Sequence, residues 1–183
     1  MMRKLRVTEM RRLTPDEFRE AGKMPLTVVL DDVRSCHNVG SVFRSCDAFR
    51  IERIILCGIT PTPPDAGIHK TALGAEDSVA WEYGASAAQA VDRLHADGYT
   101  VWSVEQCEGS TPLHSLGIAP GGRHAVVFGN EVRGVRQEVV DMCDGCIEIP
   151  QFGTKHSLNV SVAAGIVIWH FHLLAPCQSS AGR

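Results

Sequence analysis

Short apolar segments that alternate with helical patterns are the strongest restriction on the fold of this chain. Five segments have the length and the apolar, β-branched character of buried strands, at residues 26–30, 53–57, 99–104, 124–128 and 146–149. Helical patterns occupy residues 39–49, 86–96 and 137–142 between these strands and residues 160–174 after the last one. Strands that alternate with helices favour a mainly parallel sheet flanked by helices. The sequence therefore predicts an α/β fold.

Local signals add one helix and one loop to this pattern. Thr14 can cap a helix whose first position suits Pro15, and Glu17 can complete a capping box. Residues 59–67 hold three prolines and are expected to form a loop. At 183 residues, the chain is long enough for one domain with a sizeable core. The division that we expect is a basic N-terminal helical extension at residues 1–23, the main domain at residues 24–175 and a disordered tail at residues 176–183.

Composition indicates a soluble protein of the cytoplasm. Hydrophobic residues make up 44% of the chain and charged residues 21%, which is ordinary for a globular protein. The most apolar stretch, residues 158–174, contains two histidines, Asn159 and Ser161, so we expect no membrane partner. The first residues lack the apolar core of a secretory signal. Seven cysteines, odd in number and spread along the chain, favour reduced thiols over a disulfide framework.

The charge of the chain is unevenly distributed. Its net value of −3 is unusual for a dedicated nucleic-acid-binding protein. Residues 1–23 carry seven basic and four acidic side chains, whereas residues 24–183 carry eleven basic and seventeen acidic ones. A basic arm on an acidic body could bind phosphates through its local field. A solvated amphipathic helix explains the same charges, so the role of the arm stays open.

Three polar motifs follow predicted strands. Residues 31–44 contain the pattern Asn-x-Gly-x-x-x-Arg, which begins at Asn38 and ends at Arg44. Residues 126–135 run from a buried-strand pattern into Gly-Asn-Glu-x-x-Gly. Residues 149–165 lead from a strand end through a glycine-bearing loop into Ser-Leu-Asn, where a long apolar helix begins. Backbone N–H groups at such a helix start suit a polar cofactor or an oxyanion.

Together and in this order, the three motifs resemble those of the SpoU (TrmH) family of RNA methyltransferases, within the SPOUT superfamily. The resemblance covers roughly residues 26–174. It implies a single SPOUT-type domain with a C-terminal trefoil knot. It also implies transfer of a methyl group from S-adenosylmethionine to a ribose 2′-hydroxyl of structured RNA, either tRNA or rRNA. The helix expected at residues 160–174 is apolar nearly all round and needs burial on every side, which agrees with the homodimers that the family forms.

The resemblance also assigns a cofactor site. The residues expected to bind S-adenosylmethionine are Val104, Glu105, Gly129, Ile149 and Leu158. A glycine lets the backbone approach a ligand closely, and aliphatic side chains can supply apolar walls. Taken alone, Ile149 and Leu158 are better explained by core packing, and only their place within the motif favours a functional role.

The catalytic residues expected from the resemblance are Arg44, Asn38, Glu131, Ser157 and Asn159. We expect Arg44 to lie on the same side of its helix as Asn38. A guanidinium stays protonated at neutral pH, so Arg44 is better suited to clamp a phosphate or to stabilise an oxyanion than to act as a general base. Glu131 and Asn159 would fix the loop geometry, and Ser157 could contact substrate or cofactor. A substrate phosphate or a water would take the proton, and the general base stays unidentified.

Two other functions compete with this interpretation. An RNA-binding or assembly protein could keep the fold without turnover, although the presence of the motif side chains argues against it. A nucleotide-binding oxidoreductase would need Gly-x-Gly-x-x-Gly after the first strand, which residues 31–44 lack. We expect no metal, because Cys143 and Cys146 have no second cysteine pair and because His170 and His172 point to different sides of a helix.

Overall fold

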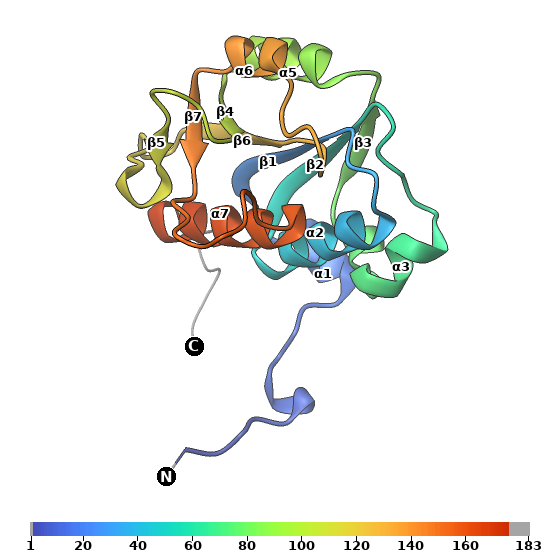
Figure 1. Ribbon diagram of the computed structural model, residues 1–183. Coiled ribbons are helices and arrows are strands. Elements are labelled where there is room, and N and C mark those ends of the chain that lie inside the picture. Colours follow the sequence, from blue (N-terminus) through green and yellow to red (C-terminus); the bar gives the residue numbers. More distant parts are fainter. Residues whose placement is uncertain (1, 176–183) are drawn as a thin grey trace.

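The fold is built on one parallel sheet. In the computed structural model, which describes residues 2–175, every strand pairing is parallel. The strands are β1 (Met24–Asp31), β2 (Ile51–Cys57), β3 (Trp81–Gly84), β4 (Tyr99–Val104), β5 (Thr111–Pro112), β6 (Arg123–Phe128) and β7 (Gly145–Glu148). Across these described residues the sheet order is β3-β2-β1-β6-β4-β7-β5 (Figure 1). The predicted α/β fold with a mainly parallel sheet is confirmed.

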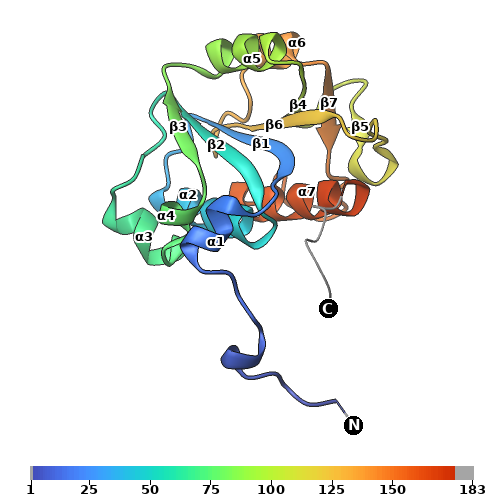
Figure 2. The same ribbon diagram turned by 180° about the vertical axis from the view of Figure 1, so that it is seen from behind.

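Helices cover both faces of the sheet (Figures 1 and 2). One face carries α1 (Pro15–Glu20), α2 (Cys36–Ala48), α3 (Ala66–Ala72), α4 (Ala75–Ser78) and α7 (Val160–Leu174). The other face carries α5 (Ala87–Ala96) and α6 (Gln137–Met142). Single 3-10 turns lie at Val7–Glu9 and Leu113–Ser115. Because both faces are covered, β1 and β6 at the centre of the sheet are buried along almost their whole length, whereas burial alternates along β4.

The predicted elements agree closely with the observed ones, but, besides the two 3-10 turns, two short α-helices and two short strands were not predicted. These are α3, α4, β3 and β5. Helix α3 begins inside the segment 59–67 that was expected to be a loop, because the Asp65 carboxylate accepts the N–H groups of Gly67 and Ile68 and caps the helix. Strands β3 and β5 are too short for a periodic signal. The capping box at the start of α1 formed as predicted.

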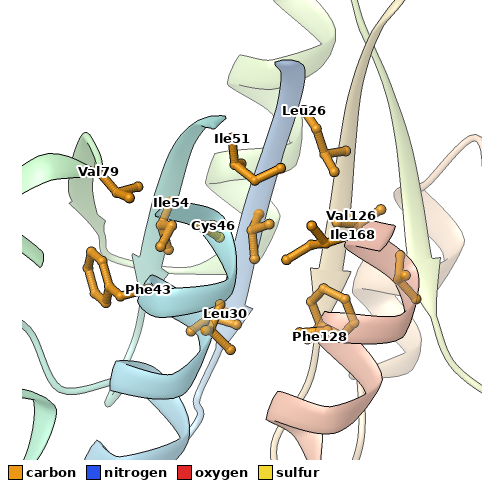
Figure 3. Packing of buried hydrophobic residues seen from close by; sticks show 14 of the residues in the cluster. Leu26, Leu30, Phe43, Cys46, Ile51, Ile54, Val79, Val126, Phe128 and Ile168 are labelled. Atoms are coloured by element: carbon orange, nitrogen blue, oxygen red, sulfur yellow. The ribbon is translucent and has the colours of Figure 1, made fainter. Parts of the chain in front are cut away.

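The larger core lies between the sheet and the layer of α2 and α7 (Figure 3). Leu30 and Phe128 from the strands meet Phe43 and Ile168 from the helices, and each is at most 2% exposed. A smaller core lies under α5 and α6 on the opposite face. These two cores hold the carboxyl ends of the strands in fixed positions, and the three motifs follow those ends.

The N-terminal segment joins the domain through α1. Phe18 is only 4% exposed and packs within the larger core, so α1 shares the core of the main domain. The boundary of the extension at residue 23 stays a prediction, and the tail predicted at residues 176–183 lies outside the described residues. In the part of the chain that the structure describes, no helix has the length and apolar character to cross a membrane.

Candidate functional site

The three motifs meet at the carboxyl edge of the sheet. Parallel strands end at the same edge, so the segments after β1, β6 and β7 come together although they are far apart in sequence. A cavity of about 560 Å³ lies there, between the ends of β4, β6 and β7 and the start of α7. All the residues expected to bind a cofactor line it, namely Val104, Glu105, Gly129, Ile149 and Leu158. The expected catalytic residues that line it are Glu131, Ser157 and Asn159.

Glu131 ties the second motif to the first. Its carboxylate accepts the backbone N–H groups of Arg34 and Ser35, each at 3.0 Å, and the side-chain amide of Asn38 at 3.1 Å. Partial burial would by itself raise the pKa of Glu131, but these donors outweigh burial and hold the pKa below its ordinary value. Glu131 is therefore ionised at neutral pH, and it fixes the loop that leads into α2.

Asn38 continues this network into the third motif. Its side-chain oxygen accepts the side-chain amide of Asn159 at 3.1 Å. Asn159 in turn caps α7, because its own side-chain oxygen accepts the backbone N–H of Ser161 at 2.9 Å and the Ser161 hydroxyl at 2.7 Å. A chain of side-chain hydrogen bonds through Glu131, Asn38 and Asn159 thus joins all three motifs.

The turn after β6 is shaped by Asn130 and Gly134. The Asn130 side chain donates to the carbonyl oxygen of Asp32 at 2.7 Å and accepts the N–H of Val132 at 2.9 Å. Gly134 has a φ of 66°, and a Cβ at this position would lie 2.0 Å from a carboxylate oxygen of Glu105. A side chain at position 134 would therefore be strained and would also collide with Glu105.

Glu105 and Gly129 both contact this turn and determine its conformation. The Glu105 carboxylate accepts the N–H of Val135 at 3.1 Å. A Cβ on Gly129 would lie 2.0 Å from the carbonyl carbon of Gly134 and 2.2 Å from the nitrogen of Val135. The structure thus shows a role for Gly129 that the sequence did not suggest. Because Gly129 has no side chain, the turn can fold back onto the end of β6.

The loop of the third motif is held by Gln106, which the sequence analysis missed. The Gln106 side-chain amide donates to the carbonyl oxygen of His156 at 2.7 Å. Two apolar side chains also line the cavity. Ile149 is half-buried, and Leu158 is 38% exposed. The position of Gln106 directly after Glu105, at the end of β4, is the one sequence signal that could have indicated it.

Arg44 lies apart from this network. Successive helical residues turn by about 100°, so Arg44 and Asn38 lie about 120° apart around α2. The expectation that they share one side of the helix is therefore wrong. Arg44 is exposed, it does not line the cavity, and among residues 2–175 its side chain has no hydrogen bond or ion pair.

The cysteine pair makes ordinary packing contacts. The thiol of Cys143 donates to the carbonyl oxygen of Val139, and that of Cys146 to the carbonyl oxygen of Glu105. Across the described residues, no group of three or more histidine, cysteine, aspartate or glutamate side chains is arranged to hold a metal ion.

A parallel sheet with helices on both faces and a cavity at its carboxyl edge defines an α/β domain of the class whose ligand sites lie at that edge. Within that class, the chain belongs to the SpoU rRNA methylase family, whose model matches residues 25–169. The resemblance that the three motifs indicated is thereby confirmed.

Named relatives fall into two groups. The 23S rRNA (guanosine-2′-O-)-methyltransferase RlmB of Neisseria meningitidis is 30% identical over 154 residues, which are 84% of this chain and 60% of that protein. The tRNA (guanosine(18)-2′-O)-methyltransferase of Thermus thermophilus is 30% identical over 162 residues, which are 88% of this chain and 81% of that enzyme. The chain thus spans about three fifths of the rRNA relative and four fifths of the tRNA relative.

Solved structures agree on the fold. The TrmH/SpoU tRNA modifying enzyme of A. aeolicus superimposes with a TM-score of 0.76 at 24% identity, over 87% of this chain and 81% of that one. The AdoMet-bound rRNA methyltransferase of Sinorhizobium meliloti gives a TM-score of 0.76 at 24% identity, over 87% of this chain and 59% of that one. This likeness confirms the architecture of the sheet and its helices.

Proposed function

We propose that the protein transfers a methyl group from S-adenosylmethionine to a ribose 2′-hydroxyl of structured RNA, either tRNA or rRNA. One observation carries the proposal: the hydrogen-bond chain through Glu131, Asn38 and Asn159 brings all three motifs to one cavity. Family membership and relatives that methylate ribose 2′-hydroxyls in both kinds of RNA agree with it.

The cavity suits this cofactor in size and charge. Its volume of about 560 Å³ lies within the usual range for a small-molecule site. Its lining contains three carboxylates, from Glu105, Glu131 and Glu148, and one guanidinium, from Arg133. This excess of negative charge favours a ligand that carries a sulfonium and an ammonium group. The residues that would hold the cofactor are Val104, Glu105, Gly129, Ile149 and Leu158, and the bound cofactor supplies an activated methyl group.

The residues of the chain would position the other reactant. Methyl transfer needs an aligned hydroxyl and relief of the charge that develops on its oxygen. Ser157 would contact the substrate or the cofactor from the cavity lining. Glu131 and Asn159 would keep the motif loops in register. The hydroxyl proton would pass to a substrate phosphate or to water, because a guanidinium is a poor general base, and Arg44 would instead serve as a phosphate clamp or oxyanion stabiliser.

A homodimer would account for two exposed features of the helical layer formed by α2 and α7. Val162, Ile166, Trp169 and Leu173 form an apolar stripe along α7 and are between 38% and 59% exposed. Arg44 is exposed on α2, which packs beside α7. Contact through this face would bury the stripe and could bring Arg44 to an active site, either its own or the partner's.

Two further properties complete the proposal. The C-terminal segment would pass through a trefoil knot, as the family resemblance implies, and the bond from Gln106 to His156 would fasten the loop that precedes α7. The protein would work in the cytoplasm. Free cysteines at positions 36, 46, 57, 107, 143 and 146 support this location.

The test combines binding with turnover. Calorimetric titration should show binding of S-adenosylmethionine and no binding of a nicotinamide dinucleotide. Radiolabelled methyl groups should then enter tRNA or rRNA at ribose, with sites mapped by their resistance to alkaline cleavage. Binding of RNA and cofactor without methyl transfer would instead support the catalytically silent RNA-binding protein, and a normal rate in Arg44→Ala would remove the role given to Arg44.

A further inference from the structure

A second cavity lies beside the first. Its volume is about 380 Å³, and it shares the turn at residues 130–134 with the first cavity. The first cavity lies on the β4 and β7 side of that turn, whereas the second is bounded by Asp31 and Asp32 at the end of β1 and by Ile59 after β2. None of the motif functions described above uses it.

The topology of the sheet accounts for this cavity. Strands β1 and β6 are neighbours, but the chain leaves β1 toward α2 on one face and leaves β6 toward α6 on the other. In open parallel sheets, the crevice between two such strands is the usual place for a ligand. The second cavity occupies that crevice.

Two arginines at this cavity have no polar partner in the part of the chain that the structure describes. Among residues 2–175 the side chains of Arg34 and Arg133 make no hydrogen bond or ion pair. A third arginine, Arg136, is already shared between Asp31, at 3.4 Å, and Glu138, at 2.9 Å. The two unpaired guanidinium groups are therefore available to an anion from outside the chain.

The remaining lining limits what that anion can be. Asp31 is 1% exposed, and one carboxylate oxygen of Asp32 accepts the N–H of Ile59 at 3.0 Å. These two carboxylates make the end of β1 unfavourable for phosphate, so a phosphate would stay with the unpaired arginines. Ile59 and Val132 are 65% and 83% exposed, and they offer apolar surface of the kind that flanks a planar base.

We propose that this cavity binds a nucleotide of the RNA substrate that neighbours the methylated one. Its phosphate would contact Arg34 and Arg133, and its base would pack against Ile59 and Val132. The identity of the ligand as RNA rests on the proposed function, whereas the nucleotide site rests on the cavity itself. Because the two cavities share one turn, a nucleotide here would place the next ribose toward the first cavity.

The site can be tested with a mononucleotide. Adenosine 5′-monophosphate is titrated into the isotopically labelled protein with S-adenosylhomocysteine present, and amide shifts are followed by NMR. Shifts are expected at Asp32, Ile59 and Val132, and both adenosine and inorganic phosphate should bind more weakly. The double variant Arg34→Ala, Arg133→Ala should weaken binding of the mononucleotide roughly tenfold. Arg50→Ala, which removes a guanidinium at the opposite edge of the sheet, should leave it unchanged.

RNA binding gives the second readout. With a labelled RNA stem-loop, the double variant should lower the slope of log affinity against log salt by about 1, because one phosphate contact is lost, while Arg50→Ala leaves the slope close to that of the wild type. Affinity for S-adenosylmethionine should stay unchanged in Arg50→Ala and in the single variant Arg34→Ala, because Arg34 lines only the second cavity. Equal effects of the double variant and Arg50→Ala, or mononucleotide shifts confined to the first cavity, would overturn the proposal. A protein that binds the mononucleotide as expected but methylates no RNA would keep the site and lose only its link to methyl transfer.

Discussion

Asn38 is the residue on which the geometry of the site depends most directly. It joins Glu131, 93 residues away in sequence, to Asn159, 121 residues away. Its amide can serve both because it donates through nitrogen to the carboxylate and accepts through oxygen from the second amide. No other side chain described here contacts all three motifs, so its loss would leave the loops separately folded but unaligned.

The variant Asn38→Ala should lower methyl transfer by roughly tenfold to a hundredfold, because positioning of the reactants would be lost. Affinity for S-adenosylmethionine should change little, since Asn38 does not line the cavity. Gln89→Ala is the matched control: each residue is the third after a serine cap, Ser35 in α2 and Ser86 in α5. Radiolabel transfer measures the rate and calorimetry the cofactor affinity. Equal rates in both variants would contradict the alignment role.

The lowered pKa of Glu131 should make the stability of the folded protein depend on pH. Its pKa in the folded protein lies below the ordinary value of 4.5, so its stabilising effect is fully present above that value and is lost as the pH falls through the folded pKa. Glu131→Gln should therefore destabilise the protein at pH 7, by roughly 1 kcal/mol for so exposed a group. The difference in melting temperature between wild type and variant should disappear in acid. A difference that grows below pH 4 would contradict this assignment.

Glu105 and Gly129 show which properties of single site residues the sequence could predict and which it could not. The family resemblance selected both as cofactor residues, and both line the cavity. Their observed contacts are with the turn at residues 130–135. Sequence could not reveal this, because the collision of a Cβ at position 129 with the backbone at position 134 depends on a φ of 66° that only coordinates show.

At the scale of elements, long strands and helices were predicted well because their apolar patterns reflect burial. Helices α6 and α7 and strand β4 begin and end where the sequence predicted. The missed strand β3 lies at the edge of the sheet, and its alternate residues Trp81 and Tyr83 are exposed. Four residues are too few for their alternation to be distinguished from chance.

The turn after β6 is the element on which cofactor binding should depend. In Gly129→Ala the new Cβ would lie 2.0 Å from the backbone of Gly134, and backbone cannot yield as a flexible side chain can. We expect a loss of roughly 2 kcal/mol in stability and at least about tenfold weaker cofactor binding. Gly153→Ala is the control, because nothing lies within 4 Å of its Cβ, and it should change stability by less than about 0.5 kcal/mol. Thermal unfolding and calorimetry measure the two effects, and a tolerated Gly129→Ala would show that the turn can shift.

At the scale of the whole molecule, α7 has two apolar faces, one buried within the chain and one exposed. One face is buried against the sheet through Val160, Ala164, Val167, Ile168 and Phe171. The opposite face carries the exposed stripe of Val162, Ile166, Trp169 and Leu173, at spacings of 4, 3 and 4 residues. Such spacing keeps side chains on one side of a helix and is typical of a helix that packs against another helix. The sequence indicated that this helix needs more burial than one domain provides, but only the structure shows which residues lack it.

A charge in this stripe should therefore separate the subunits. In Ile166→Glu the carboxylate would have to be buried at the proposed contact, and ionised groups are costly to bury without a partner. We expect sedimentation equilibrium to give a dimer for the wild type and a monomer for this variant. The monomeric variant should still be folded, because Ile166 is 38% exposed within one chain and the substitution therefore disturbs little of that chain's own core. Tyr83→Glu, at a residue 56% exposed on β3, is the control and should remain dimeric. A wild-type protein that sediments as a monomer would contradict the dimer, and it would also require Arg44 to reach the active site within its own chain.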